Sequence, residues 1–564
     1  MRGTSTDYGL AATYSPDMAT VTTPTAPSRT VGTEGIVLQP VNRVGGALGL
    51  RVEVDSASSR YAEARCSAGF FRGYENILVG RDVRDAVYIA SRCCGYHGGQ
   101  HSVAAAHAVE MALGMTPPPM AVALRNLGLC AETIHAEAAH LFLLAGPDFS
   151  ASSVSTTWPE LWVLAQRTPA PQAEIHGFAT VGDIMRSLDP ITGRWYRDAF
   201  SVARIPYQMY AVVHGKYPHP QTMVPGGVAT SMSNTTVSAV HDYVVRLLSL
   251  VDPAKRVAML ITDLLEFCVA AVPELAEVGV GPANFIDSGQ WDDPEGYDPS
   301  WEGLTERGDR RWAAPGVIAD GHLVTSDLRE VAEGVEESVT HSYYEEWSGS
   351  PHPASKRTVP APGPLAWDRR YSWSTSARWK GLAVETGPGA RLWTTALRGQ
   401  MALNPFVSAR DGAVQLLLPE GALPEMLLEW RPPTVWNAIE RTRARLYGIV
   451  FAALVAAQQS LTVLHLQKEG RHQTAVPLAI PKRGTRRGAG FSGDGLLGHW
   501  LSLDGQVIDR YQVVGPSTFN IGPGGPAEAA INGTPTLEAA GAPTGVTALV
   551  ALRSFDPCSN CATH

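Results

Sequence analysis

The sequence predicts a mainly α-helical protein of the α+β class, in which small peripheral β-sheets and hairpins surround long helices. Apolar residues recur at three- and four-residue spacing over residues 237–251, 253–276 and 433–467, as they do on the buried face of a helix. Residues 100–115 are rich in alanine, which favours helix. Residues 499–515 instead alternate apolar and polar side chains around a short turn, which is typical of a hairpin.

The residues that start or stop a segment delimit each predicted element. Residues 36–55 alternate around Gly45-Gly46, which predicts an early hairpin. The prolines at 117–119 end one helix and open the next, which we expect to reach residue 144. Asp504-Gly505 supplies the turn of the late hairpin. Residues 287–375 are rich in Trp, Asp, Gly, Pro and Ser, and we expect long surface excursions with short strands there.

The chain has no clean linker after residue 36, so we expect one domain over residues 36–564. Residues 1–35 are rich in Thr, Ser and Pro and lack an apolar core, which predicts a disordered N-terminal extension and no signal peptide. The most apolar long segment, residues 447–466, is interrupted by two glutamines and a serine at 458–460. It predicts a buried helix and no membrane span.

Composition limits the partners and the compartment. With 564 residues, 45% of them hydrophobic, the chain can bury a large core. Its net charge of -9 argues against nucleic acid or an anionic membrane as the main partner. Seven cysteines are too few for a disulfide framework, and five of them lie near the two ends of the chain. The other two, Cys130 and Cys268, lie in apolar helical surroundings and are expected to be buried. The pattern predicts a reducing compartment, with thiols kept for metal.

Two motifs match other families by their letters and fail on context. Gly488-x-Gly490-x-x-Gly493 has the spacing of a dinucleotide-binding loop, but it follows a basic stretch and precedes a strand. We expect that basic stretch, residues 482–487, to be a solvated loop. His135 and His140 are five residues apart, so on a helix their rings do not share a face and cannot form a zinc-protease pair.

Two short segments at opposite ends of the chain carry candidate metal ligands. Residues 92–101 read RCCGYHGGQH, and residues 556–564 read DPCSNCATH. A terminal C-x-x-C places two thiols on one turn, and thiolates are soft ligands suited to nickel, iron or zinc. Taken alone, this pair is also compatible with inert thiols.

Together the two segments resemble the paired signatures of nickel–iron hydrogenase large subunits, R-x-C-G-x-C-x-x-x-H and D-P-C-x-x-C-x-x-H. Further blocks match in order, namely FRGYE at 71–75, GRDVRDA at 80–86, GHW at 498–500 and YQVVGPSTFN at 511–520. The resemblance spans residues 36–564 and is loose in the middle third. It implies the fold of that family, molecular hydrogen as substrate, and a heterodimer with an iron–sulfur small subunit that carries electrons away.

The resemblance also implies which residues bind metals. Cys94 and Cys558 would be terminal nickel ligands, and Cys561 would bridge nickel to an iron that carries carbon monoxide and cyanide. Glu75 and His564 would help to bind a structural magnesium ion.

Four further residues would surround the metals by the same resemblance. Ser517, preceded by Pro516, would hydrogen-bond a cyanide ligand. Asp556 would lie just above the metals. His101 would orient one of the metal ligands.

The sequence departs from the family at four positions close to the metals. His97 replaces the second bridging thiolate, and an imidazole nitrogen, with one lone pair, cannot bridge two metals as sulfur does. Asp494 falls where the family has an arginine over the open coordination site, which reverses the local charge. Gly45 replaces the proton-transfer glutamate, and Ala136 replaces an aspartate. Glu137, beside Ala136, either compensates for that loss or packs in the core.

Two functions therefore stay open. The chain is either an active nickel-dependent hydrogen:acceptor oxidoreductase, with His97, Asp494 and Asp556 at its catalytic site, or a degenerate homologue with a structural, regulatory or single-metal role. Three cysteines and a histidine also make an ordinary zinc site, which suits the second reading. The persistence of the terminal motif and of Glu75 favours the enzyme. We expect the protein in the cytoplasm, or at a membrane through a partner.

Overall fold

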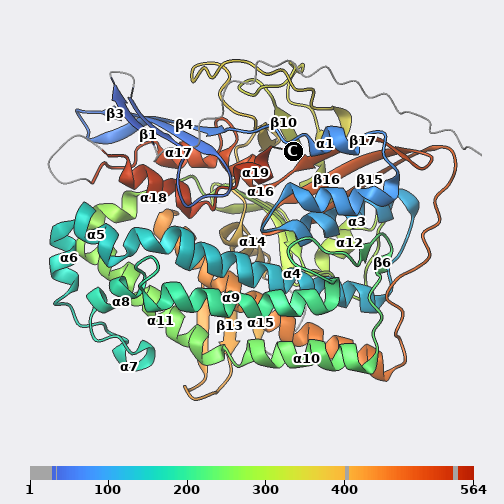
Figure 1. Ribbon diagram of the computed structural model, residues 1–564, viewed down its shortest axis with the longest axis horizontal. Helices are drawn as coiled ribbons and strands as arrows, with labels where there is room; N and C mark the ends of the chain where they lie inside the picture. The colour runs from blue at the N-terminus through green and yellow to red at the C-terminus, as the bar shows by residue number, and fades with distance from the viewer. Residues whose placement is uncertain (1–27, 33–34, 400–405, 538–543, 564) are drawn as a thin grey trace, which may run out of the picture.

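The computed structural model describes residues 28–32, 35–399, 406–537 and 544–563. Its architecture confirms the predicted class: long helices pack side by side, and small antiparallel sheets lie around them (Figure 1). The described residues form six sheets, of which the largest has four strands. The core of the molecule is thus formed by packed helices, with the sheets around it.

The long helices form one packed layer. They are α4 (Pro119–Ala139), α9 (Arg194–His214), α10 (Asn234–Leu248), α11 (Val251–Ala271) and α15 (Ala438–Lys468). Helix α15 lies against α4 and α10, and α4 lies against α9 (Figure 1). By length and composition α15 could cross a membrane, yet 56% of its most apolar window is buried inside the protein. It is a core helix, as the sequence predicts.

Helix α3 (Gly98–Leu113) packs on a three-stranded sheet of β15 (Thr485–Ser492), β16 (Leu497–Asp504) and β17 (Val507–Val514). The β16–β17 hairpin confirms the prediction, whereas β15 is not predicted, and its first residues belong to the basic stretch 482–487 that was expected to be a loop. A Cβ at Gly488 would lie only 1.9 Å from the Ala108 carbonyl oxygen. Glycine is therefore used here to let the strand backbone touch the helix.

An N-terminal sheet holds the early hairpin. Its strands are β1 (Ser28–Gly32), β2 (Gly35–Gln39), β3 (Leu48–Asp55) and β4 (Arg60–Ala68), paired in that order. Strand β1 belongs to the segment expected to be disordered; it pairs with β2 and so extends the sheet. Residues 1–27 and 33–34, to which the rest of that expectation applies, lie outside the described residues.

The segment 287–375, predicted to lie on the surface, contributes to the core. Every residue of β7 (Phe285–Gln290) is buried, and so are six of the seven residues of β8 (Ala313–Ala319). Apolar residues there are spread among Gly, Asp and Trp, which hides the pattern of a buried strand. The remaining strands are β5 (Met223–Val224), β6 (Gly227–Val228), β9 (His322–Thr325), β10 (Val335–Ser338), β11 (Ser376–Trp379), β12 (Val407–Arg410), β13 (Ala413–Leu418) and β14 (Met426–Trp430).

Short helices complete the chain, and the last of them, α19, packs against α16 and β4. Helix α4 continues into a wider turn, His140–Ala145, so that the helical stretch ends close to the predicted residue 144. The short helices are α1 (Tyr74–Leu78), α2 (Ala86–Ala90), α5 (Ala151–Thr157), α6 (Pro159–Ala165), α7 (Ala173–His176), α8 (Val181–Ser187), α12 (Leu304–Asp309), α13 (Leu328–Glu333), α14 (Pro388–Arg398), α16 (Pro516–Ile521), α17 (Pro526–Ile531), α18 (Val546–Ser554) and α19 (Ser559–Ala562).

Candidate metal centre

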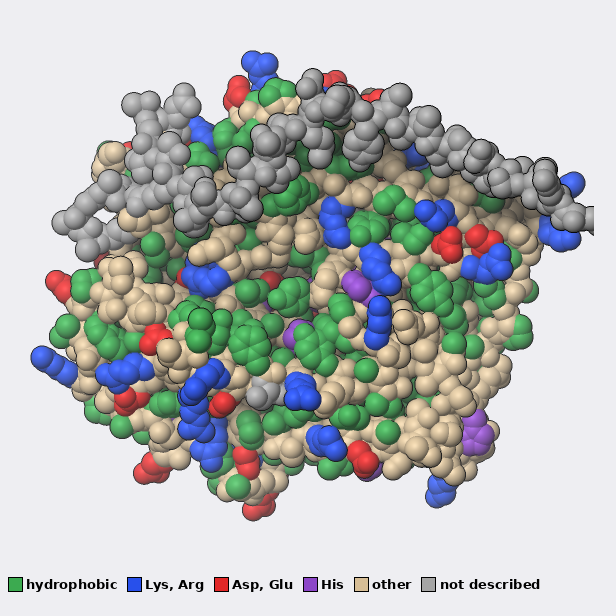
Figure 2. Space-filling model, viewed as in Figure 1, with side chains coloured by type: hydrophobic (Ala, Val, Ile, Leu, Met, Phe, Trp, Pro, Cys, Tyr) green, Lys and Arg blue, Asp and Glu red, His purple; other side chains and the backbone are tan. Residues whose placement is uncertain are grey.

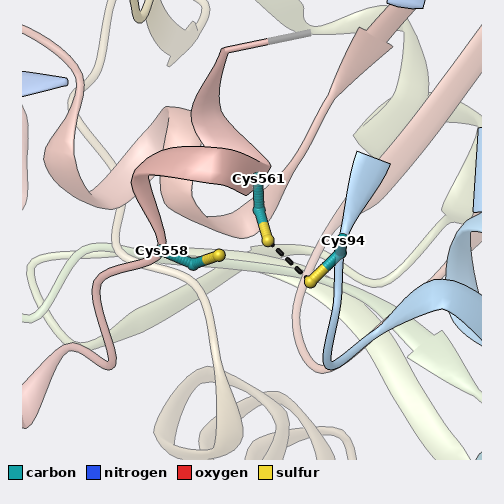
Figure 3. Close-up of side chains that lie close together, drawn as sticks. All are labelled: Cys94, Cys558 and Cys561. Carbon is teal, nitrogen blue, oxygen red and sulfur yellow. Dashed lines mark hydrogen bonds between the residues drawn. The ribbon is translucent and has the colours of Figure 1, made fainter. Parts of the chain in front are cut away.

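The two cysteine segments meet in space, as Figure 3 shows. Cys94 lies in the loop before α3, Cys558 immediately precedes α19, and Cys561 lies within α19. The Sγ atoms of Cys94 and Cys561 are 2.7 Å apart, and the three Sγ atoms all lie within 4.8 Å of one another. Cys94 and Cys561 are buried, and Cys558 is partly exposed. Sequence reasoning placed these three thiols at one site, and the geometry brings them together.

Arg72 fastens the two segments to each other. Its guanidinium donates to the carbonyl oxygens of Arg92, at 2.9 Å, and of Asn560, at 3.0 Å. It also donates to the carbonyl oxygen of Cys93, whose side chain is not one of the three clustered thiols. One half-buried cation thus bonds carbonyls from both ends of the chain and holds the Cys94 segment beside α19.

His97 is the fourth potential donor. Its Nδ1 lies 3.6 Å from the Cys94 Sγ, and its Nε2 is buried without a hydrogen-bond partner. Burial alone would lower the pKa of His97, but the hydrogen bond with Cys94 outweighs it and raises the pKa to about 10. Burial alone would likewise raise the pKa of the Cys94 thiol, but hydrogen bonds from the other two thiols and from His97 bring it well below its usual value. Without metal the site thus behaves as a thiolate–imidazolium pair.

This donor set fits a soft metal ion. Three thiols and one imidazole with an unpartnered nitrogen match the ligands that nickel, iron and zinc take in proteins. The set does not supply the second sulfur bridge of a two-metal centre, because His97 occupies that place. The three thiols can therefore hold either a two-metal centre with a single sulfur bridge or one metal ion.

Asp494 does not act as a free negative charge above the site. Its Oδ1 accepts hydrogen bonds from Arg391, at 2.7 Å, and from Thr133, at 2.9 Å, and its Oδ2 accepts one from Gln100, at 2.7 Å. Its Oδ2 lies 3.8 Å from the Nε2 of His97. The buried guanidinium of Arg391 pairs with this carboxylate and also lies 3.8 Å from the Asp287 carboxylate, so it offsets the expected reversal of charge only in part.

A cavity of about 40 Å³ adjoins the thiols, and a second guanidinium lines it. Arg445, from α15, forms an ion pair with Glu137 at 2.6 Å and lies 3.9 Å from the Asp556 carboxylate. Burial raises the pKa of Glu137 to about 7, against the pull of Arg445. Asp556 has a φ of 52°, a left-handed backbone that Asp tolerates better than most residues. The cavity is therefore lined by one guanidinium and by three carboxyl groups, those of Glu137, Asp494 and Asp556, near the metal ligands.

Sequence reasoning missed both Arg391 and Arg445. Each lies on a helix that carries apolar residues on either side, and each is less than 6% exposed. A basic residue inside such an apolar helix was the available signal, because a buried arginine needs a partner.

The residues expected around the metals lie in the same cavity. Ser517, at the start of α16, accepts a hydrogen bond from the Cys558 backbone N–H at 3.2 Å, and Pro516 lies beside it. His101 also lines the cavity, and its Nδ1 lies 3.0 Å from the His499 Nε2. The serine is thus in direct contact with a metal-ligand segment, whereas His101 contacts a second histidine.

Glu75 belongs to a separate cluster of hard oxygen donors. It is buried, and its Oε1 accepts a hydrogen bond from the Val513 backbone N–H at 2.9 Å. Burial, and the nearby charge of Glu337, raise its pKa well above the usual value. Gln512 bonds Glu337 through its Nε2, at 3.3 Å, and leaves its own buried Oε1 without a partner. Two buried carboxyls and an orphaned carbonyl oxygen fit a hard divalent cation; His564 lies outside the described residues.

The glycine at position 45 has a physical reason. Gly45 pairs with Cys558 as a parallel bridge, and a Cβ at Gly45 would lie 2.9 Å from the Cys558 Sγ. A small cavity of about 20 Å³ separates Gly45 from Ala136 and His97. No larger residue fits at position 45 while Cys558 keeps its place.

Comparison with known proteins supports one family. The family model for nickel-dependent hydrogenase matches residues 72–157 and 188–564. The Hydrogenase-2 large chain of Escherichia coli K12 is 28% identical over 581 residues, which cover 94% of this chain and 97% of that protein. The quinone-reactive Ni/Fe-hydrogenase large chain of Wolinella succinogenes is 27% identical and covers 94% of this chain and 96% of its own length.

Solved structures agree with this assignment. The actinobacterial-type NiFe-hydrogenase from Ralstonia eutropha H16 superposes with a TM-score of 0.90 at 32% identity and covers 94% of this chain and 100% of that chain. The Ni-Fe-Se hydrogenase from Desulfomicrobium baculatum superposes with a TM-score of 0.73 at 25% identity and covers 94% of this chain and 100% of its own. The family model alone spans more than half of the chain. With the fold and the thiol cluster, this shows that the chain belongs to the nickel-dependent hydrogenase large-subunit family.

Proposed function

We propose that this chain is the metal-site subunit of a hydrogen:acceptor oxidoreductase. One observation carries the proposal: three thiols from opposite ends of the chain converge beside a cavity that holds a buried guanidinium and carboxyl groups. A nickel–iron centre carrying carbon monoxide and cyanide supplies, when bound, a place where hydrogen is split heterolytically. Cys94, Cys558, Cys561 and His97 would hold the metals, and Ser517 would donate to a diatomic ligand.

In this proposal Arg445 and Glu137 take over roles from altered positions. The Arg445 guanidinium keeps a positive charge in the cavity where Asp494 cannot. Because Gly45 has no side chain to carry a proton, Glu137 is the acceptor that we assign to the proton released from hydrogen. Its pKa of about 7 suits a group that must both take up and release a proton near neutral pH.

The proton role is tested by Glu137→Gln, which keeps the size of the side chain and removes its acid–base function. Loss of a general acid or base costs ~10²–10⁴-fold in rate, so hydrogen-dependent dye reduction should fall by about 10²-fold or more. Glu137→Asp keeps a carboxyl group and should recover part of that loss. If Glu137→Gln turns over at the parental rate with full metal content, the proton leaves by another group.

Electrons need a route out of the chain, because the other four cysteines are buried and form no second cluster within the described residues. We propose an iron–sulfur small subunit as the acceptor. Its contact surface would include five exposed large apolar side chains that flank Arg72 and Arg92: Phe70, Phe71, Ile77, Tyr88 and Tyr96. Figure 2 shows one face of the molecule where hydrophobic side chains gather over α4 and α9. Such an obligate interface typically buries more than ~2,000 Å².

We also propose magnesium at the Glu75 cluster. Glu75, Glu337 and Gln512 would provide oxygen ligands, as a hard cation prefers. A bound Mg²⁺ would neutralise two carboxyls that burial otherwise drives toward their protonated forms. It would tie the segment after β4 to β17 and so brace the metal centre from behind.

A second candidate is a degenerate large-subunit homologue that binds a single zinc ion or acts only in assembly. One observation favours it: His97 stands in place of a bridging sulfur and lies 3.6 Å from the Cys94 Sγ, beside the three clustered thiols. Three cysteines and one histidine are an ordinary zinc ligand set. In this case the cavity beside the thiols would serve no reaction.

Metal analysis of the complex purified from its own host separates the two candidates. The enzyme predicts nickel and iron together with infrared bands of carbon monoxide and cyanide. Zinc alone, without those bands, would establish the second candidate as a zinc protein. Protein free of all three metals would overturn both metal sites and leave only the assembly role. Cys561→Ser should abolish the metal, whereas Cys268→Ser, which alters an equally buried thiol on α11, should leave it bound.

A further inference from the structure

A second cavity lies on the sheet that covers α3. It has a volume of about 600 Å³, within the range of pockets that hold small molecules. Strands β15–β17 form one wall, and the segments around Trp301 and His352 form the other. It shares no lining residue with the cavity beside the thiols. Nothing in the proposed hydrogen chemistry uses it.

Three polar residues stand in one row across that sheet. Arg487 on β15 pairs with Ser502 on β16, and Ser502 pairs with Arg510 on β17. Directly opposite residues on neighbouring strands point to the same face, with Cβ atoms ~4.5–5.5 Å apart. The row therefore presents two guanidiniums on either side of a hydroxyl, and all three residues line the cavity.

The two guanidiniums have no acidic partner among the described residues. Arg510 donates to the Ala354 carbonyl oxygen at 2.9 Å, and neither arginine forms an ion pair with a described carboxylate. Glu302 also lines the cavity, on the wall opposite the sheet, without reaching them. Their strands are separated by β16, so the two backbones lie roughly 10 Å apart. One anion placed over Ser502 can accept hydrogen bonds from both guanidiniums.

Aromatic side chains lie next to the row of Arg487, Ser502 and Arg510, two residues away along the strands. Trp500 pairs with Ala489 and Gln512, and its ring stands edge-on to His352, with centroids 5.6 Å apart. The small side chain of Ala489 leaves space beside the indole. Trp500 is only 3% exposed, and its buried Nε1 has no hydrogen-bond partner. Trp301 faces the same space from the other wall.

We propose that this cavity binds a planar aromatic molecule that carries one anionic group, such as a sulfonate, carboxylate or phosphate. The anionic group lies on Arg487, Ser502 and Arg510, where it accepts charge-assisted hydrogen bonds. The ring packs against Trp301, and the buried indole of Trp500 lies behind the opposite wall. Glu302 disfavours negative charge on the far wall, so the ligand enters with its anion toward the sheet. The site is independent of the hydrogenase function.

The test uses the purified full-length complex and 8-anilinonaphthalene-1-sulfonate, an aromatic sulfonate whose fluorescence rises on binding. N-phenyl-1-naphthylamine, which has the same rings and no charge, is the matched probe. We expect saturable binding of the sulfonate at one site, and binding of the uncharged probe about 10-fold weaker or more, because a charge-assisted bond is lost. Equal affinity for the two probes would overturn the proposal, and so would the absence of saturable binding.

Variants locate the site. Arg487→Gln and Arg510→Gln should each weaken sulfonate binding by about 10-fold, and Trp301→Ala by about 5-fold. Arg483→Gln, a change in the same basic stretch outside the cavity, should leave the affinity unchanged. Metal content should stay constant in all four variants, which separates a failure here from a failure of the hydrogenase proposal. If Arg483→Gln weakens binding as much as Arg487→Gln, the probe recognises only general surface charge and the proposal is wrong.

Discussion

Replacement of Gly45 by alanine should weaken metal binding although position 45 supplies no ligand. The added Cβ would lie 2.9 Å from the Sγ and 3.1 Å from the Cα of Cys558. Ordinary contacts between such atoms are about 3.5–4.0 Å, so Cys558 must move by roughly 0.5–1 Å. Overpacking of this kind costs about 1–3 kcal/mol. Without metal, Cys558 can shift outward and relieve the clash, so the cost falls mainly on the metal-bound state.

This cost corresponds to a loss of about 5- to 150-fold in metal affinity, at tenfold per ~1.4 kcal/mol. Cobalt(II), whose thiolate complexes absorb visible light, can be titrated into the metal-free chain in competition with a chelator. Gly95→Ala is the matched control, because Gly95 follows Cys94 directly and a Cβ there meets nothing within 4 Å. The reasoning is refuted if Gly45→Ala binds cobalt as tightly as the parent, or if Gly95→Ala loses as much.

Three further predictions follow from buried charge and surface. Asp494→Asn leaves the Arg391 guanidinium with one charged partner fewer. It should therefore lower the free energy of unfolding, measured by urea denaturation, by about 3 kcal/mol. Adding Arg391→Met to the same chain should restore part of that free energy. Burial raises the pKa of Glu528 from 4.5 to about 7, so its contribution to stability is full below pH 4.5 and is lost as the pH rises through 7. Glu528→Gln should therefore flatten the fall in the urea midpoint between pH 4.5 and 8, and an unchanged slope would exclude this carboxyl. Tyr96→Asp should release the small subunit on gel filtration, whereas Val324→Asp, at a more exposed apolar position on β9, should not.

Periodic patterns in the sequence predicted three of the long helices, α10, α11 and α15, and the late hairpin, but not the long helix α9. Apolar spacing in α10, α11 and α15 reflects their packing on neighbouring helices, and the turn at Asp504-Gly505 sets the hairpin register. Strand β15 was not predicted because its Gly488 serves a close approach of the strand backbone to α3. That contact is visible only in the folded structure. The pairing of adjacent strands can therefore be predicted from the local sequence, whereas the packing of a strand on a distant helix cannot.

The candidate site was predictable where a motif holds the ligands. Cys94, Cys558 and Cys561 follow from two motifs, and the structure places their sulfurs together. Arg391 and Arg445 lie far in the sequence from both cysteine motifs, and no spacing rule connects them to the thiols. Glu337 is likewise far in the sequence from Glu75. The departure at Asp494 looked like a reversal of charge in the sequence, and only the fold shows the guanidinium that offsets it in part.

The contacts of Arg72 and Gly45 with the end of the chain set an order of assembly. The two thiols that lie closest together, those of Cys94 and Cys561, are 467 residues apart in sequence. A chain still lacking its last residues can form the helical layer and the sheets, yet it offers a metal only one of the three thiols. Metal capture is therefore coupled to the final step of folding, when α19 docks beside Gly45 and Arg72 closes on its backbone.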